Sequence, residues 1–316
     1  MKHHRIVCVA AALVVASPVS LAPVFAQAVT PLVDSAWLKQ HLSTPGVVVL
    51  SARLRAPRSV YEKGHIPGAV YTDYAKDGWR AKDKSGVPAM LASVAKLETL
   101  IGSLGISNAS HVVIAPAGMN ALDMGAATRL YWTFKVLGHD KVSILDGGWV
   151  AWSKVDKNTK RPDNPIAKGG VTPKKAVFKA SLRKDMLVSD DDVKTAMNGK
   201  VSLVENRPSD FYLGISKSPA AAKAGTIPGA KNVEERWLTK NGGGRFRDKV
   251  QLEKIYKAAG VSTQGDQITF CNTGHWASLG WFASSEILGN KKARMYDGSM
   301  AAYTRRKDLP LDQKIK

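Results

Sequence analysis

The sequence carries the same motifs in the same order in both of its halves. Residues 65–69 read His-Ile-Pro-Gly-Ala, and residues 226–230, 161 positions later, read Thr-Ile-Pro-Gly-Ala. Residues 145–149 read Leu-Asp-Gly-Gly-Trp, and residues 296–300, 151 positions later, read Tyr-Asp-Gly-Ser-Met. The two offsets differ by only about ten residues, which loops of different length can absorb. The repeat therefore predicts two structural copies of one fold.

Short apolar runs alternate with helical patterns in each copy. In the first copy, strands are predicted at 47–50, 111–115 and 142–145, and helices at 91–104 and 126–137. In the second copy, strands are predicted at 201–204, 267–271 and 293–296, and helices at 252–259 and 277–288. Such alternation is typical of a parallel sheet covered by helices on both faces. We therefore predict an α/β protein with two tandem domains, each built on a mainly parallel sheet.

The N-terminal segment has the layout of a secretory signal peptide. Lys2 and Arg5 precede an apolar run at 6–16, and small residues near Ala26 provide a cleavage site. The run is about half of the ~20 residues that a membrane-spanning helix needs, so we expect removal and not a stable membrane anchor. The signal is assigned to 1–26, and the mature protein is expected to be periplasmic or secreted.

The rest of the chain divides into a first domain at 27–153, a basic linker without periodicity at 154–184, and a second domain at 185–316. The formal net charge of the chain is +20, which can indicate nucleic acid or an anionic surface as a partner. Export and the lack of a nucleic-acid fold signature argue against nucleic acid. We interpret the charge as a solvated basic surface, which would also concentrate small anionic substrates.

Loss of the signal leaves one cysteine, Cys271, because Cys8 lies in the apolar run that is removed. Exported proteins usually use cysteines in pairs, since their compartment is oxidising. A lone thiol is most often a small buried core residue, so the sequence around Cys271 has to decide between a core role and a chemical one.

The neighbours of Cys271 favour a chemical role. The thiol directly follows a predicted strand and precedes a predicted helix, at the sheet edge where α/β proteins bind ligands. Unpaired N–H groups at a helix N-terminus stabilise a thiolate. Gly274 would let the backbone curl so that several amides face one anion. The segment 271–277, Cys-Asn-Thr-Gly-His-Trp-Ala, is therefore predicted to be the reactive loop.

These features together resemble the tandem rhodanese family, the two-domain thiosulfate and 3-mercaptopyruvate sulfurtransferases. The resemblance extends over about 31–311 and includes the Gly68 and Gly229 turns and the stretch 138–149. In that family the first copy lacks the cysteine, and the second carries it in a loop that opens Cys-x-x-Gly. Here Ala115 aligns with Cys271. The resemblance implies two rhodanese-like domains, of which only the C-terminal one is catalytic.

The family resemblance also implies the reaction and the site. The Cys271 thiolate would take the outer sulfur of thiosulfate or a similar anionic donor as a persulfide, and an acceptor such as cyanide or a thiol would remove it. Arg207, which follows a predicted strand, would hold the donor. The loop residues that would bind substrate are Asn272, Thr273, Gly274, His275, Trp276 and Ala277. No cofactor or metal is expected, and a protein could serve as the sulfur acceptor.

The sequence departs from the family pattern at positions that bear on the donor. The family usually has Asp-x-Arg at the end of the strand predicted at 201–204, whereas this chain has Glu205-Asn206-Arg207. The first copy has Arg53 at the matching place, with no acidic residue two positions before it. The loop lacks the Arg or Lys of thiosulfate enzymes and the small neutral residues of mercaptopyruvate enzymes. His275 could supply a positive charge or a hydrogen-bond donor, or it could face solvent. Trp276 could form a wall of the pocket or pack between the domains. The choice between the two donors therefore stays open.

Other classes of thiol protein fit less well. A dithiol oxidoreductase needs a second cysteine where Gly274 stands, and a cysteine-loop phosphatase needs an arginine to close the loop. No metal-ligand spacing and no phosphate-binding glycine loop is present. A non-enzymatic persulfide carrier that receives sulfur from a protein partner needs the same loop, and it stays open as an alternative.

Overall fold

The computed structural model describes Met1 and residues 29–315 of the chain, so the predicted signal peptide lies outside the described residues apart from Met1. The N-terminal half forms a five-stranded parallel sheet. Its strand order is β1 (Leu32–Val33), β7 (Val142–Leu145), β6 (His111–Ala115), β2 (Val47–Ser51) and β3 (Val70–Tyr71).

The C-terminal half forms a second, four-stranded parallel sheet. Its order is β11 (Ala293–Met295), β10 (Gln267–Phe270), β8 (Ser202–Glu205) and β9 (Lys231–Asn232). A small antiparallel pair, β4 (Arg80–Ala81) with β5 (Met90–Leu91), belongs to the first half. The predicted α/β fold in two tandem copies with parallel sheets is confirmed.

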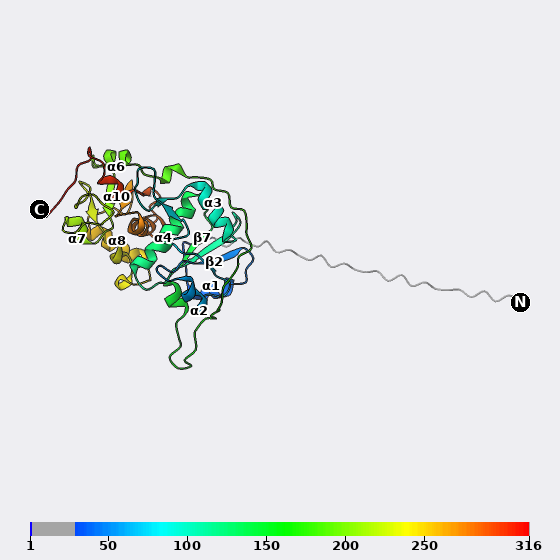
Figure 1. Cartoon of the computed structure of the whole chain (residues 1–316). Helices are drawn as coiled ribbons and strands as arrows, with labels where there is room; N and C mark the ends of the chain where they lie inside the picture. The colour runs from blue at the N-terminus through cyan, green and yellow to red at the C-terminus, as the bar shows by residue number, and fades with distance from the viewer. Residues whose placement is uncertain (2–28, 316) are drawn as a thin grey trace.

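Helices surround both sheets (Figure 1). The α-helices are α1 (Ser35–His41), α2 (Arg58–Lys63), α3 (Val94–Ser103), α4 (Ala121–Val136), α5 (Gly148–Trp152), α6 (Asp190–Ala196), α7 (Ser209–Leu213), α8 (Lys249–Ala258), α9 (His275–Phe282) and α10 (Ser299–Tyr303). Short 3-10 turns are η1 (Lys184–Met186), η2 (Glu235–Leu238) and η3 (Lys240–Gly242), and α9 continues as a π-helical segment η4 (Ala283–Ile287).

The predicted and observed elements differ mainly at their ends. The helix predicted at 91–104 begins at Val94, because Met90–Leu91 pairs with β4 instead. The helix predicted at 126–137 begins five residues earlier, since the side chain of Asn120 caps it by accepting from the Asp123 N–H. The segment 154–184 contains no regular element before η1 and runs along the first domain, where Ala176 N donates to Gly102 O.

Helices α4 and α9 pack against each other and join the two domains (Figure 1). Small residues allow this close approach: a Cβ added to Gly125 would lie 2.7 Å from His275 Nε2. The Thr128 and Ser278 hydroxyls share a hydrogen bond of 2.8 Å across the contact. Because both helices are buried around almost their whole circumference, the domains form one continuous core.

The repeated Asp-Gly motif also joins the domains. Asp146 Oδ1, in the first copy, accepts a hydrogen bond of 2.9 Å from the backbone N–H of Phe246 in the second domain. Asp297 Oδ2, in the second copy, accepts one of 2.7 Å from the N–H of Leu91 in the first domain. The motif therefore forms a reciprocal contact, in which the aspartate of each domain accepts a hydrogen bond from the backbone of the other domain.

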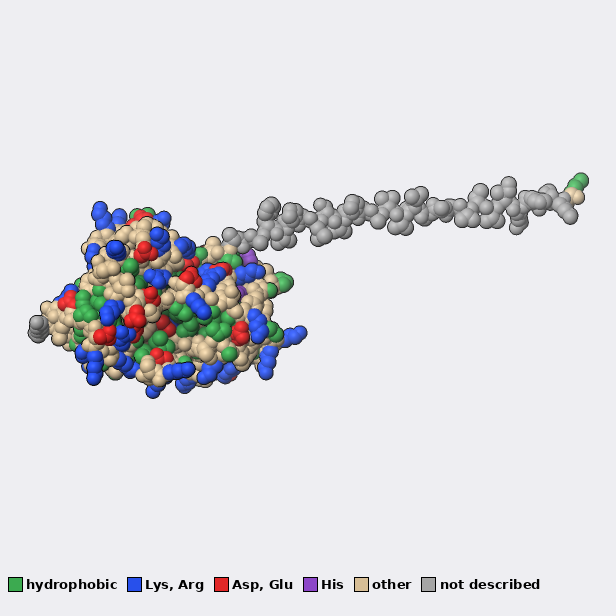
Figure 2. Space-filling view, turned by 90° about the horizontal axis from the view of Figure 1, so that it is seen from above, with side chains coloured by type: hydrophobic (Ala, Val, Ile, Leu, Met, Phe, Trp, Pro, Cys, Tyr) green, Lys and Arg blue, Asp and Glu red, His purple; other side chains and the backbone are tan. Residues whose placement is uncertain are grey.

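Lys and Arg side chains spread over the visible face of the molecule, with Asp and Glu among them (Figure 2). Within the part of the chain that the structure describes, no helix combines the length and apolarity needed to cross a bilayer.

Candidate active site

Cys271 lies at the carboxyl end of β10, a strand that has neighbours on both sides. Its side chain is buried, with 1% exposure, at the inner end of a pocket of about 290 Å³ between the two domains. The C-terminal domain contributes Ser218, Cys271, Asn272, Thr273, His275 and Trp276 to the pocket, and the N-terminal domain contributes Leu54, Arg55, Tyr74, Arg80 and Leu122. The only cysteine of the predicted mature chain thus lines an interdomain pocket.

Ser299 holds the loop that carries the thiol. Its Oγ accepts hydrogen bonds from the N–H groups of Cys271 (3.1 Å) and Gly274 (3.2 Å), and donates to Tyr296 O (2.9 Å). Ser299 is fully buried at φ +49°, a backbone region that favours glycine, and the first copy has Gly148 there at φ +53°. A serine in a glycine conformation indicates that the hydroxyl has a specific task, here the fixing of the loop.

The predicted anion cradle is therefore smaller than the sequence suggests, because two of its amides bind Ser299. The N–H groups of Asn272 and Thr273 donate to no acceptor among the described residues. Gly274 makes the turn at φ +75°, and α9 starts at the next residue. Free amides at a turn that leads into a helix N-terminus attract a negative charge.

The counterpart of Cys271 in the first copy is Pro116, and not Ala115 as the sequence alignment predicts. The N–H of Met300 donates to Cys271 O (3.0 Å), and the matching N–H of Trp149 donates to Pro116 O (2.8 Å). The alignment is off by one because the first-copy loop is one residue shorter between this position and its glycine at φ +77°. Proline has no nucleophile, so the first copy still lacks a reactive side chain.

Arg207, predicted to hold the donor, lies beneath the loop and does not line the pocket. It is 1% exposed, pairs with Glu205, and donates to Gly225 O (2.7 Å) and to Asn272 Oδ1 (3.4 Å). The bond to Asn272 links the arginine to the residue after the thiol. Direct donor binding by Arg207 stays a prediction, whereas its contacts favour positioning of the loop.

The first copy supports a positioning role for this arginine. Arg53 occupies the equivalent place after β2, is also buried, and donates to Gly64 O (2.5 Å) as Arg207 donates to Gly225 O. Its guanidinium lies 4.2 Å from the ring centre of Trp149. Since no thiol is present in that copy, the buried arginine there holds the turn before the repeated Ile-Pro-Gly-Ala motif.

His275 faces the N-terminal domain and carries no charge. Its Nε2 donates to Leu122 O (2.9 Å), and its Nδ1 accepts from the hydroxyl of Tyr74 (2.9 Å). Burial, followed by the nearby Arg80, lowers the pKa of His275 to about 3, and burial raises the pKa of Tyr74. Of the roles that the sequence left open for His275, the structure supports the hydrogen-bond donor, and it supports neither the positive charge nor the solvent-facing position.

An ion pair supports the loop from below. Arg129, on α4 of the N-terminal domain, contacts Asp297 at 2.6 Å, and both side chains are buried. A Cβ added to Gly274 would overlap Nη1 of Arg129 and lie 3.0 Å from Asp297 Oδ1. Gly274 is thus required both for its backbone angle and for the space that the ion pair fills.

The remaining predicted loop residues separate into two groups. Thr273 and Trp276 line the pocket, and the Trp276 ring lies 6.4 Å from that of Phe211. Ala277 is fully buried outside the pocket, where its carbonyl accepts from Thr269 Oγ1 at 3.0 Å. The position of Ala277 therefore does not support direct contact with a substrate.

Sequence reasoning missed the residues that the N-terminal domain places in the pocket. Arg55 follows β2 by four residues, and Arg80 lies on β4. Tyr74 stands eight residues after the first Ile-Pro-Gly motif begins at Ile66. None of them belongs to a motif, and only the packing of α4 against α9 brings them to Cys271.

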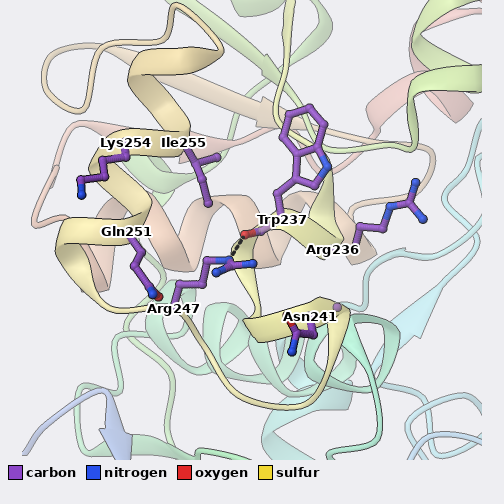
Figure 3. Close-up of a pocket in the computed structure, with 8 residues that line it drawn as sticks. Arg236, Trp237, Asn241, Arg247, Gln251, Lys254 and Ile255 are labelled. Atoms are coloured by element: carbon purple, nitrogen blue, oxygen red, sulfur yellow. Dashed lines mark hydrogen bonds between the residues drawn. The ribbon is translucent and has the colours of Figure 1, made fainter.

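A larger pocket, of about 590 Å³, lies between η2 and α8 (Figure 3). Trp237, Arg247 and Lys254 line it, and Arg247 Nε donates to Trp237 O at 2.9 Å. No cysteine lines this pocket, so the smaller one is the candidate active site. Among the described residues, no group of His, Cys, Asp and Glu has the arrangement of a metal site.

The Rhodanese-like domain family matches two stretches of the chain, 34–155 and 189–306. The chain belongs to the rhodanese family. It is 32% identical over 289 residues to a protein of Saccharopolyspora erythraea provisionally named a thiosulfate sulfurtransferase, with 89% of this chain and 95% of that protein covered. It is 28% identical to the 3-mercaptopyruvate sulfurtransferase of Escherichia coli K12, with 90% of this chain and 98% of that protein covered.

A comparison with solved structures also finds the rhodanese fold. The crystal structure of SseA from Escherichia coli, described as a 3-mercaptopyruvate sulfotransferase with the rhodanese fold, matches with a TM-score of 0.71 and 26% identity. The match covers 85% of this chain and 98% of SseA. The prediction of two rhodanese domains in a rhodanese-type sulfurtransferase is confirmed at this level.

Proposed function

We propose that the chain transfers a sulfane sulfur from thiosulfate to a thiophilic acceptor, such as cyanide or a thiol, through a persulfide on Cys271. One observation carries this proposal: the lone thiol lines a pocket between the two domains, on a loop in which the amides of Asn272 and Thr273 donate to no acceptor among the described residues. The similarity to a protein provisionally named a thiosulfate sulfurtransferase supports thiosulfate as the donor.

The chemistry proceeds by two displacements. The Cys271 thiolate attacks the outer sulfur of thiosulfate, the S–S bond of the donor breaks, and sulfite leaves with the electron pair. The product is a Cys271 persulfide anion. Cyanide or a thiolate then attacks the terminal sulfur, which gives thiocyanate or a new persulfide and returns the Cys271 thiolate. The amides of Asn272 and Thr273 stabilise the anionic sulfur in both states.

We also propose that the protein works outside the cytoplasm after removal of residues 1–26. The charged start, the short apolar run and the small residues before Ala26 support export. We expect mass spectrometry to find a processed chain that begins near Gln27 in the periplasm or the medium. A full-length chain in the cytoplasm would contradict it.

The sulfur-transfer proposal is tested by mass spectrometry with sulfite measured in parallel. Thiosulfate should add one sulfur atom to the wild-type protein and release one equivalent of sulfite, and Cys271→Ser should show neither. Treatment of the same protein with 3-mercaptopyruvate tests the second donor, which is the one in the name of the Escherichia coli relative. If neither donor gives a mass gain, the enzyme proposal fails and a carrier loaded by a protein partner becomes the better account.

A further inference from the structure

We infer that the N-terminal domain, which has no thiol, provides the anion-binding site for the donor through Arg55 and Arg80. The inference rests on the proposed function and names two residues that bind the sulfonate end of the donor. Both arginines line the pocket that Cys271 closes, and both come from the domain opposite the loop. The donor would therefore lie between a thiol from one domain and two positive charges from the other.

Arg80 is held in place but keeps hydrogen-bonding capacity. Its guanidinium lies 4.3 Å from the ring centre of Tyr74, which fixes the side chain against the pocket wall. Its Nε is buried and has no hydrogen-bond partner among the described residues. A buried donor without a partner is costly unless a ligand satisfies it, so its position favours an anion in the pocket.

Arg55 lies at the outer part of the same pocket. It is exposed and has a φ of +59°, an uncommon angle for a residue with a side chain. Among the described residues, neither Arg55 nor Arg80 forms an ion pair with a carboxylate. The pocket lining includes no Asp or Glu. The two charges are therefore available to a ligand.

Two other basic side chains near the loop lie outside the pocket. Arg129 and Arg207 are buried beside the carboxylates of Asp297 and Glu205, and neither lines the pocket. His275 lines the pocket but is neutral, because burial lowers its pKa to about 3. The loop itself has no Arg or Lys. Arg55 and Arg80 thus take the place that a basic loop residue would otherwise fill, which explains how this loop can serve an anionic donor.

The positive charges of Arg55 and Arg80 would act both when the donor binds and when sulfite leaves. Thiosulfate carries two negative charges toward a thiolate, and the sulfite that leaves also carries two. With the outer sulfur directed at Cys271, the sulfonate oxygens point away from the loop, toward the wall that Arg55 and Arg80 form. Charge-assisted hydrogen bonds from a guanidinium hold such oxygens well. They offset the repulsion as the donor binds and stabilise sulfite as it forms.

The test compares Arg55→Gln, Arg80→Gln and the double variant with Arg58→Gln. Arg58 is a matched control, since it is an exposed arginine three residues from Arg55 that pairs only with Glu62 and does not line the pocket. We expect each single variant to lower kcat/KM for thiosulfate about ten- to hundredfold, mainly through KM. The control should stay within about twofold. Arg55→Gln keeps the test valid if Arg80→Gln fails to fold, because Arg55 is exposed.

A second measurement separates this inference from the proposed function. Iodoacetate and iodoacetamide alkylate a thiol in the same way but differ in charge, so the ratio of their rates at Cys271 reports the field in the pocket. The ratio should fall severalfold in the double variant and not in Arg58→Gln. An unchanged ratio together with an unchanged KM for thiosulfate would overturn the inference. A reduced ratio in a protein that no donor converts to a persulfide would retain the anion site and reject the proposed activity.

Discussion

Replacing Gly274 with Ala probes the link between the reactive loop and the buried ion pair below it. Two costs add in this variant. An L-residue at φ +75° costs about 1–2 kcal/mol. The new Cβ would also overlap Nη1 of Arg129, which is 1% exposed and lies beside the Asp297 carboxylate. Moving Arg129 away from Asp297 breaks a buried ion pair, at a further ~3–5 kcal/mol. We therefore expect Gly274→Ala to lower the free energy of unfolding by about 4–7 kcal/mol.

Gly229→Ala is the matched control for this measurement. Gly229 has nearly the same backbone angle, φ +79°, in the same domain, and a Cβ added there would have no atom within 4 Å. Urea unfolding should therefore show a loss of about 1–2 kcal/mol for Gly229→Ala, which reflects the backbone term alone. The rate of persulfide formation should fall only in Gly274→Ala. If the two variants lose the same free energy within about 0.5 kcal/mol, the ion pair does not support the loop as described.

Two further predictions concern the residues around the loop. Because burial lowers the pKa of His275 from 6.5 to about 3, the unfolded chain binds this proton below pH 6.5 while the folded chain does not. The free energy of unfolding should then fall by about 1.4 kcal/mol for each pH unit below 6.5, and His275→Gln should lack that part in urea titrations at pH 5 and 7. Arg207→Gln should lower the thermal midpoint and slow thiosulfate and 3-mercaptopyruvate alike, because it loosens the turn and Asn272; a selective rise in KM for one donor would instead show direct contact.

The fold could be predicted largely from local patterns, because the strands are short apolar runs between clear turn signals. The predicted strands at 111–115 and 142–145 agree with the observed ones. The start of the helix predicted at 91 was wrong, since Met90–Leu91 pairs with β4, a partner that helical periodicity does not reveal. The ends of helices and strands that depend on a pairing partner elsewhere in the chain cannot be predicted from such local patterns.

The candidate site could be predicted only as far as its own loop. Cys271 and Gly274 follow from the order of strand, loop and helix, which is local. The orientation of His275 depends on Tyr74, some 200 positions earlier, and so could not be inferred from the loop. Ser299 was visible as part of a repeated motif, but its hydrogen bonds to the loop amides required the structure.

The two copies have diverged into complementary parts of one site. In the first copy, the loop after β6 is closed by backbone: Gly147 N donates to Gly244 O at 2.9 Å, and a Cβ on Gly244 would overlap the backbone of Gly118. The first-copy loop is therefore packed against the backbone of the second domain, with no space for a side chain at Gly244. In the second copy, the equivalent loop faces the first domain across a pocket instead. Because the thiol and the free arginines lie on opposite sides of that pocket, neither domain alone contains both the nucleophile and the anion site. The proposed anion site therefore makes the N-terminal domain part of the reaction, because its arginines line the pocket opposite Cys271.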